Sequence, residues 1–141
     1  MRALGQIEGR LGELLEAAPS AAHAAELLRL GEEVLEHWVA AHGQRPTDEL
    51  REGFRLLALH RQGALDEPSF NACRETCREL VYHYNLLISE PDRSDAGRRA
   101  LMMARLANHL YLFVAGKLQV SQLGEFCCAS RPLRAQADGP G

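Results

Sequence analysis

Apolar side chains recur every three or four residues along most of the chain, which is the spacing of amphipathic α-helices. Prolines, glycines and capping residues divide this pattern into five segments, and no alternating pattern of convincing length indicates a β-strand. The sequence therefore predicts an all-α fold. The predicted helices begin at Leu4, Ser20, Thr47, Asp66 and Ser94, and they end at or before Ala18, Gly43, Gly63, Pro91 and Gln119.

The third predicted helix depends on its capping residues. Thr47 is a good N-cap, and the two acidic residues that follow it would lie in the first turn, where the helix dipole favours negative charge. Leu50 is then expected to face inward, and Gly63 is expected to end the helix.

The most apolar stretch of the chain runs from residue 100 to residue 116. Only Arg105, Asn108 and His109 interrupt it, so a helix here must be covered by other helices or by a second subunit. It is too short and too polar to span a bilayer, which needs about 20 predominantly apolar residues. We therefore expect an antiparallel bundle of about five helices with a largely buried C-terminal helix, formed by residues 1–126 as one domain.

The last helix carries more apolar surface than four neighbouring helices are expected to cover. Because unbranched methionines adapt to different contacts, this surface predicts an interface, and a homodimer is the expected state. The expected interface residues, with Leu112 beside them, are Leu101, Met102, Met103, Leu106, Leu110 and Phe113.

The composition is that of an ordinary globular protein. The 141 residues are 46% hydrophobic and 25% charged, with a net charge of -3. Arg98, Arg99, Arg131 and Arg134 form at most a small basic patch, so nucleic acid is not an expected partner. No signal peptide is visible at the start, which favours the cytoplasm, and residues 127–141 are expected to form a flexible tail.

A few polar residues on the last two helices are candidates for ligand binding. Glu79 and His83 are four residues apart, as are Arg105 and His109, so each pair lies on one helix face, and Tyr82 lies beside the first pair. Arg105 and His109 either mark the solvent-facing edge of the last helix or line a cleft with the other three. Such a cleft could act on a nucleotide, an RNA or a metal ion.

Metal binding has weak support in the sequence. The chain lacks the Glu-x-x-His motif of helical di-metal sites, and its cysteines lack the tight knuckle of structural zinc sites. Cys73 and Cys77 are expected to be buried as small hydrophobic residues. No metal ligand, cofactor or catalytic residue is assigned. The sequence thus favours a non-enzymatic protein-interaction or regulatory module, with the ligand-binding or catalytic cleft as the alternative.

Overall fold

The computed structural model describes residues 1–121, which form five α-helices and two short 3-10 helices and contain no β-strand. The predicted all-α bundle is confirmed. In chain order the elements are α1 (Leu4–Glu16), η1 (Ala21–His23), α2 (Ala24–Ala41), α3 (Arg55–Ala64), η2 (Pro68–Cys73), α4 (Arg74–Ser89) and α5 (Ala96–Ser121).

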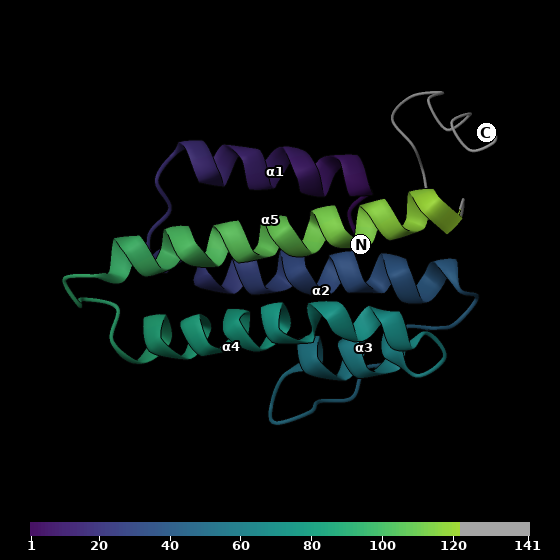
Figure 1. Cartoon of the computed structure of the whole chain (residues 1–141). Coiled ribbons are helices and arrows are strands. Elements are labelled where there is room, and N and C mark those ends of the chain that lie inside the picture. The colour runs from purple at the N-terminus through teal and green to yellow at the C-terminus, as the bar shows by residue number, and fades with distance from the viewer. Residues whose placement is uncertain (122–141) are drawn as a thin grey trace.

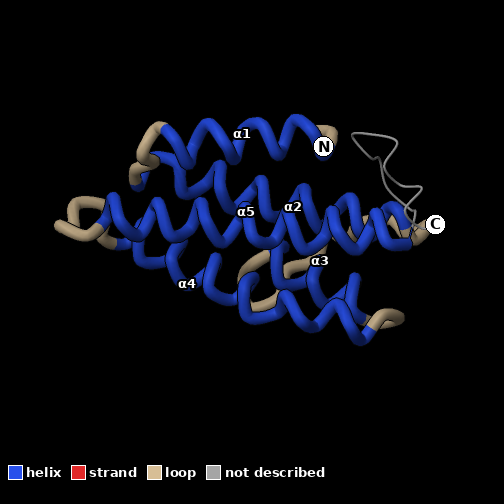
Figure 2. The backbone as a smooth tube through the Cα atoms, turned by 45° about the horizontal axis from the view of Figure 1, so that its top comes forward, coloured by secondary structure: helices blue, strands red, loops and turns tan. Residues whose placement is uncertain are grey.

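The longest helix, α5, organises the packing. It packs against α4, α2 and α1, and Figures 1 and 2 show it lying between α1 and α4. Helices that follow each other in the chain, α1 with α2 and α4 with α5, run antiparallel (Figure 1). By contrast, α2 and α5 run in the same direction although they pack together. One face of α5, which includes Met102, Arg105, His109 and Leu112, is exposed to solvent.

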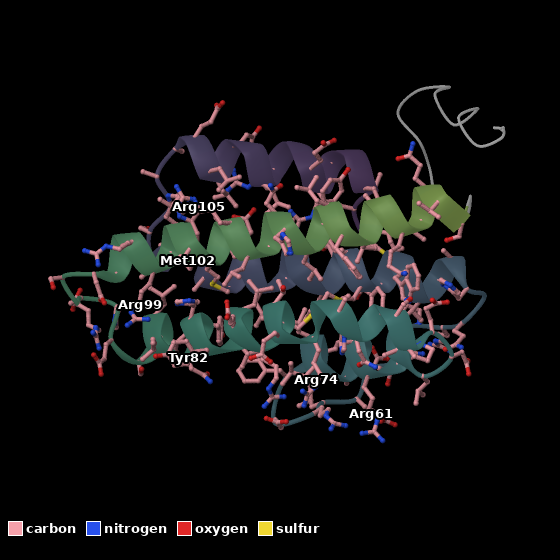
Figure 3. The ribbon with its side chains drawn as sticks, viewed as in Figure 1. Arg61, Arg74, Tyr82, Arg99, Met102 and Arg105 are labelled. Atoms are coloured by element: carbon pink, nitrogen blue, oxygen red, sulfur yellow. The ribbon has the colours of Figure 1, made fainter. Side chains whose placement is uncertain are left out.

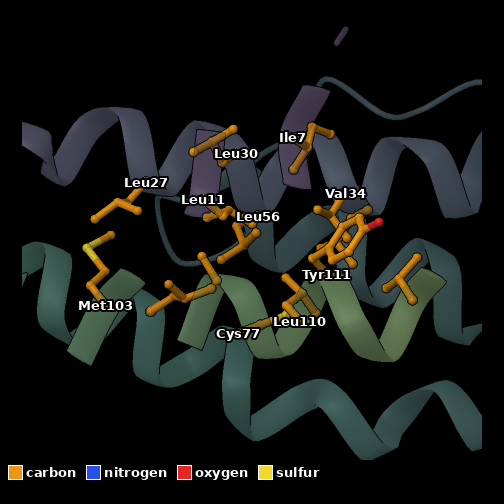
Figure 4. Close-up of a cluster of buried hydrophobic side chains, with 14 of the residues drawn as sticks. Ile7, Leu11, Leu27, Leu30, Val34, Leu56, Cys77, Met103, Leu110 and Tyr111 are labelled. Carbon is orange, nitrogen blue, oxygen red and sulfur yellow. The ribbon is translucent and has the colours of Figure 1, made fainter. Parts of the chain in front are cut away.

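The core takes side chains from all five α-helices, as Figure 4 shows. The four-three stripe of α1, including Ile7 and Leu11, is fully buried as its spacing predicts. Gly31 of α2 lies where leucines of three helices converge, because a Cβ atom at this position would be 3.3 Å from Leu56 and 3.5 Å from Leu80. The absence of a side chain at Gly31 allows this close packing.

The prediction that the third helix begins at Thr47 is wrong, because α3 begins at Arg55. Glu52 and Gly53 have φ angles of 54° and 85°, which no α-helix accommodates. The Thr47 hydroxyl instead accepts a hydrogen bond from the backbone N–H of residue 49 at 3.0 Å, which closes a short turn. As a result Leu50 is exposed, not inward-facing.

The end of α3 and the start of the fourth helix also differ from the prediction. Gly63 does not end α3, which continues to Ala64, and the fourth helix begins as the 3-10 helix η2 with α4 following at Arg74. The predicted burial of Cys73 and Cys77 is confirmed, and both are free thiols.

The buried carboxylate of Glu33 on α2 ties the N-terminus to the bundle. Glu33 accepts hydrogen bonds from the backbone and the guanidinium of Arg2, and it forms an ion pair with Arg29. Burial alone would raise the pKa of Glu33, but the hydrogen bonds from Arg2 outweigh it and hold that pKa below its usual value. His37, four residues on, bonds the Arg2 carbonyl oxygen at 2.6 Å. Glu33 and His37 therefore serve the fold and not a shared ligand.

Candidate functional site

A groove of about 410 Å³ lies between α4 and the start of α5. Its volume falls within the range of small-ligand sites. It includes three of the five predicted ligand-binding residues and one predicted interface residue. The residues that line it are Glu79, Tyr82, His83, Asp95, Arg98, Arg99 and Met102.

Helical spacing explains why these side chains meet. Residues 79, 82 and 83 are three and four apart on α4. Residue 95, just before α5, and residues 98, 99 and 102 in its first turns repeat the same spacing. Because a short loop joins the two antiparallel helices, both sets face one groove. The sequence analysis missed Asp95 and assigned Arg98 and Arg99 only to a basic patch, although this spacing could have placed all three on one face.

A cation and an aromatic ring shape one wall of the groove. The guanidinium carbon of Arg99 lies 5.9 Å from the centre of the Tyr82 ring, and its Nε atom donates a hydrogen bond to Asp95 at 3.1 Å. The hydrogen bond from Arg93, with further attraction from Arg99, lowers the pKa of Asp95. Figure 3 shows Tyr82, Arg99 and Met102 at this end of the bundle. The groove thus combines an apolar surface with a fixed charge pattern.

His83 holds the one buried side-chain nitrogen or oxygen without a hydrogen-bond partner in the described part of the chain, its Nδ1 atom. Its ring packs against that of Tyr82 with 5.4 Å between ring centres. Burial lowers the pKa of His83, and the charge of Arg99 lowers it further, whereas Glu79 opposes both effects. The lowered pKa favours the neutral imidazole, whose Nδ1 atom can form a hydrogen bond with a ligand.

We expect His83 to titrate below about 6.5, the ordinary value for histidine. Replacing Arg99 with glutamine removes the nearby positive charge but leaves the burial of the ring. The titration midpoint of His83 should therefore rise part of the way toward the ordinary value. The same change at the exposed Arg105 serves as the control and should leave the midpoint unchanged. Histidine ring resonances followed by NMR between pH 4 and 9 measure this. A wild-type midpoint at or above the ordinary value contradicts the described environment of His83.

The other two predicted ligand-binding residues lie elsewhere. Arg105 and His109 are exposed on α5, and neither lines the groove. Figure 3 places Arg105 on the side of α5 nearer α1. The five residues of the predicted cleft are therefore not assembled into one site.

The predicted interface residues divide into three groups. Met102 is 42% exposed, whereas Leu101, Leu106 and Phe113 are partly buried. Two others, Met103 and Leu110, lie wholly in the core of the bundle and offer no free surface. Leu112, beside them on the outer face of α5, is 56% exposed. The apolar surface on α5 is thus narrower than the sequence suggested.

Residues 1–121 contain neither a cluster of metal-binding side chains nor a helix that could cross a membrane. No three His, Cys, Asp or Glu side chains of this part lie close enough together to hold a metal ion. No helix in the same part combines the length and apolar character needed to cross a membrane. The predicted tail, the domain limit at residue 126, Arg131 and Arg134 lie outside the described residues.

Comparison of the chain with protein-family models, with curated proteins and with solved structures gave no match.

Proposed function

We propose that this protein is a non-catalytic interaction module that associates with a second copy of itself through the outer face of α5. The observation that carries the proposal is that Met102 and Leu112 are exposed on α5, with Tyr82, 57% exposed, beside Met102 on α4. Side chains of this size on one face of a helix pair are typical of contact surfaces, where aromatic residues and methionine are enriched.

The charges around this surface favour a second copy as the partner. Glu79, Arg98 and Arg105 are exposed and form no ion pair within the described chain. A two-fold contact brings the same patch of both subunits together, so the patch must be complementary to itself. Unpaired charges of both signs around an apolar centre meet that requirement, since Glu79 of one copy can pair with an arginine of the other.

Two further observations bear on the role and on the compartment of the protein. Arg105 and His109 lie apart from His83, so two of the five residues of the predicted cleft take no part in the groove. The described cysteines, Cys73 and Cys77, are free and buried, which is in keeping with the reducing cytoplasm as the expected compartment.

Size-exclusion chromatography with light scattering tests the dimer. We expect the wild-type protein to be a dimer at micromolar concentration, and Met102→Glu to be a monomer because it introduces a charge at the centre of the contact. Leu50→Glu is the matched control, since Leu50 is 66% exposed but lies on the connection before α3. It should remain a dimer. A monomeric wild-type protein, or a dimer that Met102→Glu leaves intact, contradicts the proposal.

A second candidate function is the binding of a small aromatic carboxylate in the groove. The unpaired Nδ1 atom of His83 favours it, since a buried polar atom without a partner is costly unless a ligand satisfies it. Arg98 offers a cation for the carboxylate, and Met102 offers an apolar contact for the ring. Titration with benzoate should then give saturable NMR shifts at these residues. Shifts that rise linearly without saturating would remove this candidate.

A further inference from the structure

A second hollow, separate from the α4–α5 groove, concentrates positive charge. It has a volume of about 290 Å³ and lies between α3, the connection before it and the start of α4. Four arginines line it: Arg51, Arg61, Arg74 and Arg78. Figure 3 places Arg61 and Arg74 on the side of the bundle away from Arg105. We call this hollow the arginine pocket.

The positive charge of the arginine pocket is only partly neutralised. Arg78 donates two hydrogen bonds to the carboxylate of Glu52, at 2.9 and 3.2 Å. The guanidinium groups of Arg51, Arg61 and Arg74 form no hydrogen bond or ion pair within residues 1–121, and none of the residues that line the pocket is acidic. Like charges held near one another repel, so an anion bound among them would relieve the repulsion.

The effect of these arginines on the pKa of the neighbouring Glu52 supports this view. The hydrogen bonds from Arg78 lower the pKa of Glu52, and the nearby charges of Arg51 and Arg74 lower it further. A negative charge at this place is therefore stabilised by three of the four arginines. Glu52 is exposed and supplies one charge, which leaves the pocket with a net positive charge.

The rest of the pocket wall combines apolar side chains with the polar side chains of His60 and Asn71. Leu57 and Ala64 of α3 and the exposed Leu65 that follows it line this side, and Asn71 adds an amide that can donate hydrogen bonds. An anion that carries an organic group could place its charge among the arginines and its carbon atoms against Leu65. The mixture of surfaces thus fits an organic anion better than a bare inorganic one.

We propose that the arginine pocket binds the phosphate group of a small phosphate monoester. Arginine suits phosphate because its planar fork donates paired hydrogen bonds to two oxygens, and a dianion matches an excess of positive charge better than a monovalent carboxylate does. The volume of the pocket, about 290 Å³, is large enough for a phosphate with a small organic group. This site is independent of the α4–α5 groove and of the proposed dimer.

Calorimetric titration at constant ionic strength tests the proposal with three probes. Phenyl phosphate should bind saturably, inorganic phosphate should bind more weakly because it lacks contact with the apolar wall, and benzoate should bind weakest at this pocket. NMR shifts should locate the first two probes at Asn71 and Arg74 and spare Arg105. Inorganic phosphate binding as tightly as phenyl phosphate, or shifts spread evenly over exposed arginines, would overturn the proposal.

Three variants sharpen the test, and all change exposed side chains. The double variant Arg61→Gln with Arg74→Gln should weaken phenyl phosphate binding by about a hundredfold, since each charge-assisted contact contributes roughly tenfold. Arg105→Gln, an exposed arginine outside the pocket, should have no effect. Glu52→Gln should tighten binding because it frees Arg78. Unchanged affinity in the double variant, or weaker binding in Glu52→Gln, would contradict the assignment.

Discussion

Replacing Phe70 with alanine should lower the free energy of unfolding by about 3–5 kcal/mol. Phe70 belongs to η2 and is fully buried. Its ring stacks on Trp38 of α2 with 4.5 Å between centres, lies 5.5 Å from the ring of His60 on α3, and lies 5.8 Å from the ring of Phe113 on α5. One side chain therefore joins three helices, and its removal leaves a cavity that none of them can fill alone.

Urea denaturation followed by circular dichroism measures this loss. Phe54→Ala is the matched control, because Phe54 is only partly buried and meets one ring, that of Tyr84, at 5.8 Å. We expect a clearly smaller loss for the control. Equal losses for the two variants, or a loss below about 1 kcal/mol at Phe70, would mean that η2 is not packed as described.

The second large effect is expected at Gly63. A Cβ atom at this position would lie 2.7 Å from the Trp38 side chain and 3.0 Å from that of Phe70. The Trp38 indole also donates a hydrogen bond to the Gly63 carbonyl oxygen at 3.1 Å, so the ring cannot move away without losing it. We therefore expect Gly63→Ala to destabilise the protein by about 1–3 kcal/mol, as overpacking does elsewhere.

Gly12 provides a control with the opposite sign. It lies inside α1, and a Cβ atom there would meet nothing within 4 Å. Gly12→Ala should raise the free energy of unfolding by up to about 1 kcal/mol, because alanine favours the helix. Thermal and urea denaturation of both variants would measure the contrast. If both changes stabilise the protein, Gly63 is not the close-contact position that the structure describes.

Helical periodicity predicts most of this fold, because the burial of apolar side chains determines which segments become helices and which of their faces point inward. The stripes of α1, α2 and α5 need only an apolar core to become helices, and their buried faces follow from the spacing. The start of α3 depends instead on a competition between local structures. Thr47 and the acidic residues after it suit a helix, but Gly53 and the turn around it prevail. Capping residues alone do not reveal the outcome of that competition.

The two hollows differ in how far the sequence reveals them. Three groove residues on α4 share a face, so the sequence places Glu79, Tyr82 and His83 together, but the rotation of α5 about its own axis decides that Arg105 is left out. The arginine pocket has no comparable signal. Its charges extend from Arg51 to Arg78, and only the packing of α3 beside α4 brings them together.

The most direct test of the proposed self-association uses the three methionines as reporters. Met102 lies on the proposed contact, Met103 is fully buried next to it, and Met1 is 64% exposed at the N-terminus. When protein with labelled methionine methyl groups is mixed with protein that carries a different isotope label, NMR can record only those contacts that link two different subunits. We predict such contacts from the Met102 methyl group and none from Met103 or Met1. Contacts from Met1 alone, or none at all at micromolar concentration, would contradict association through α5.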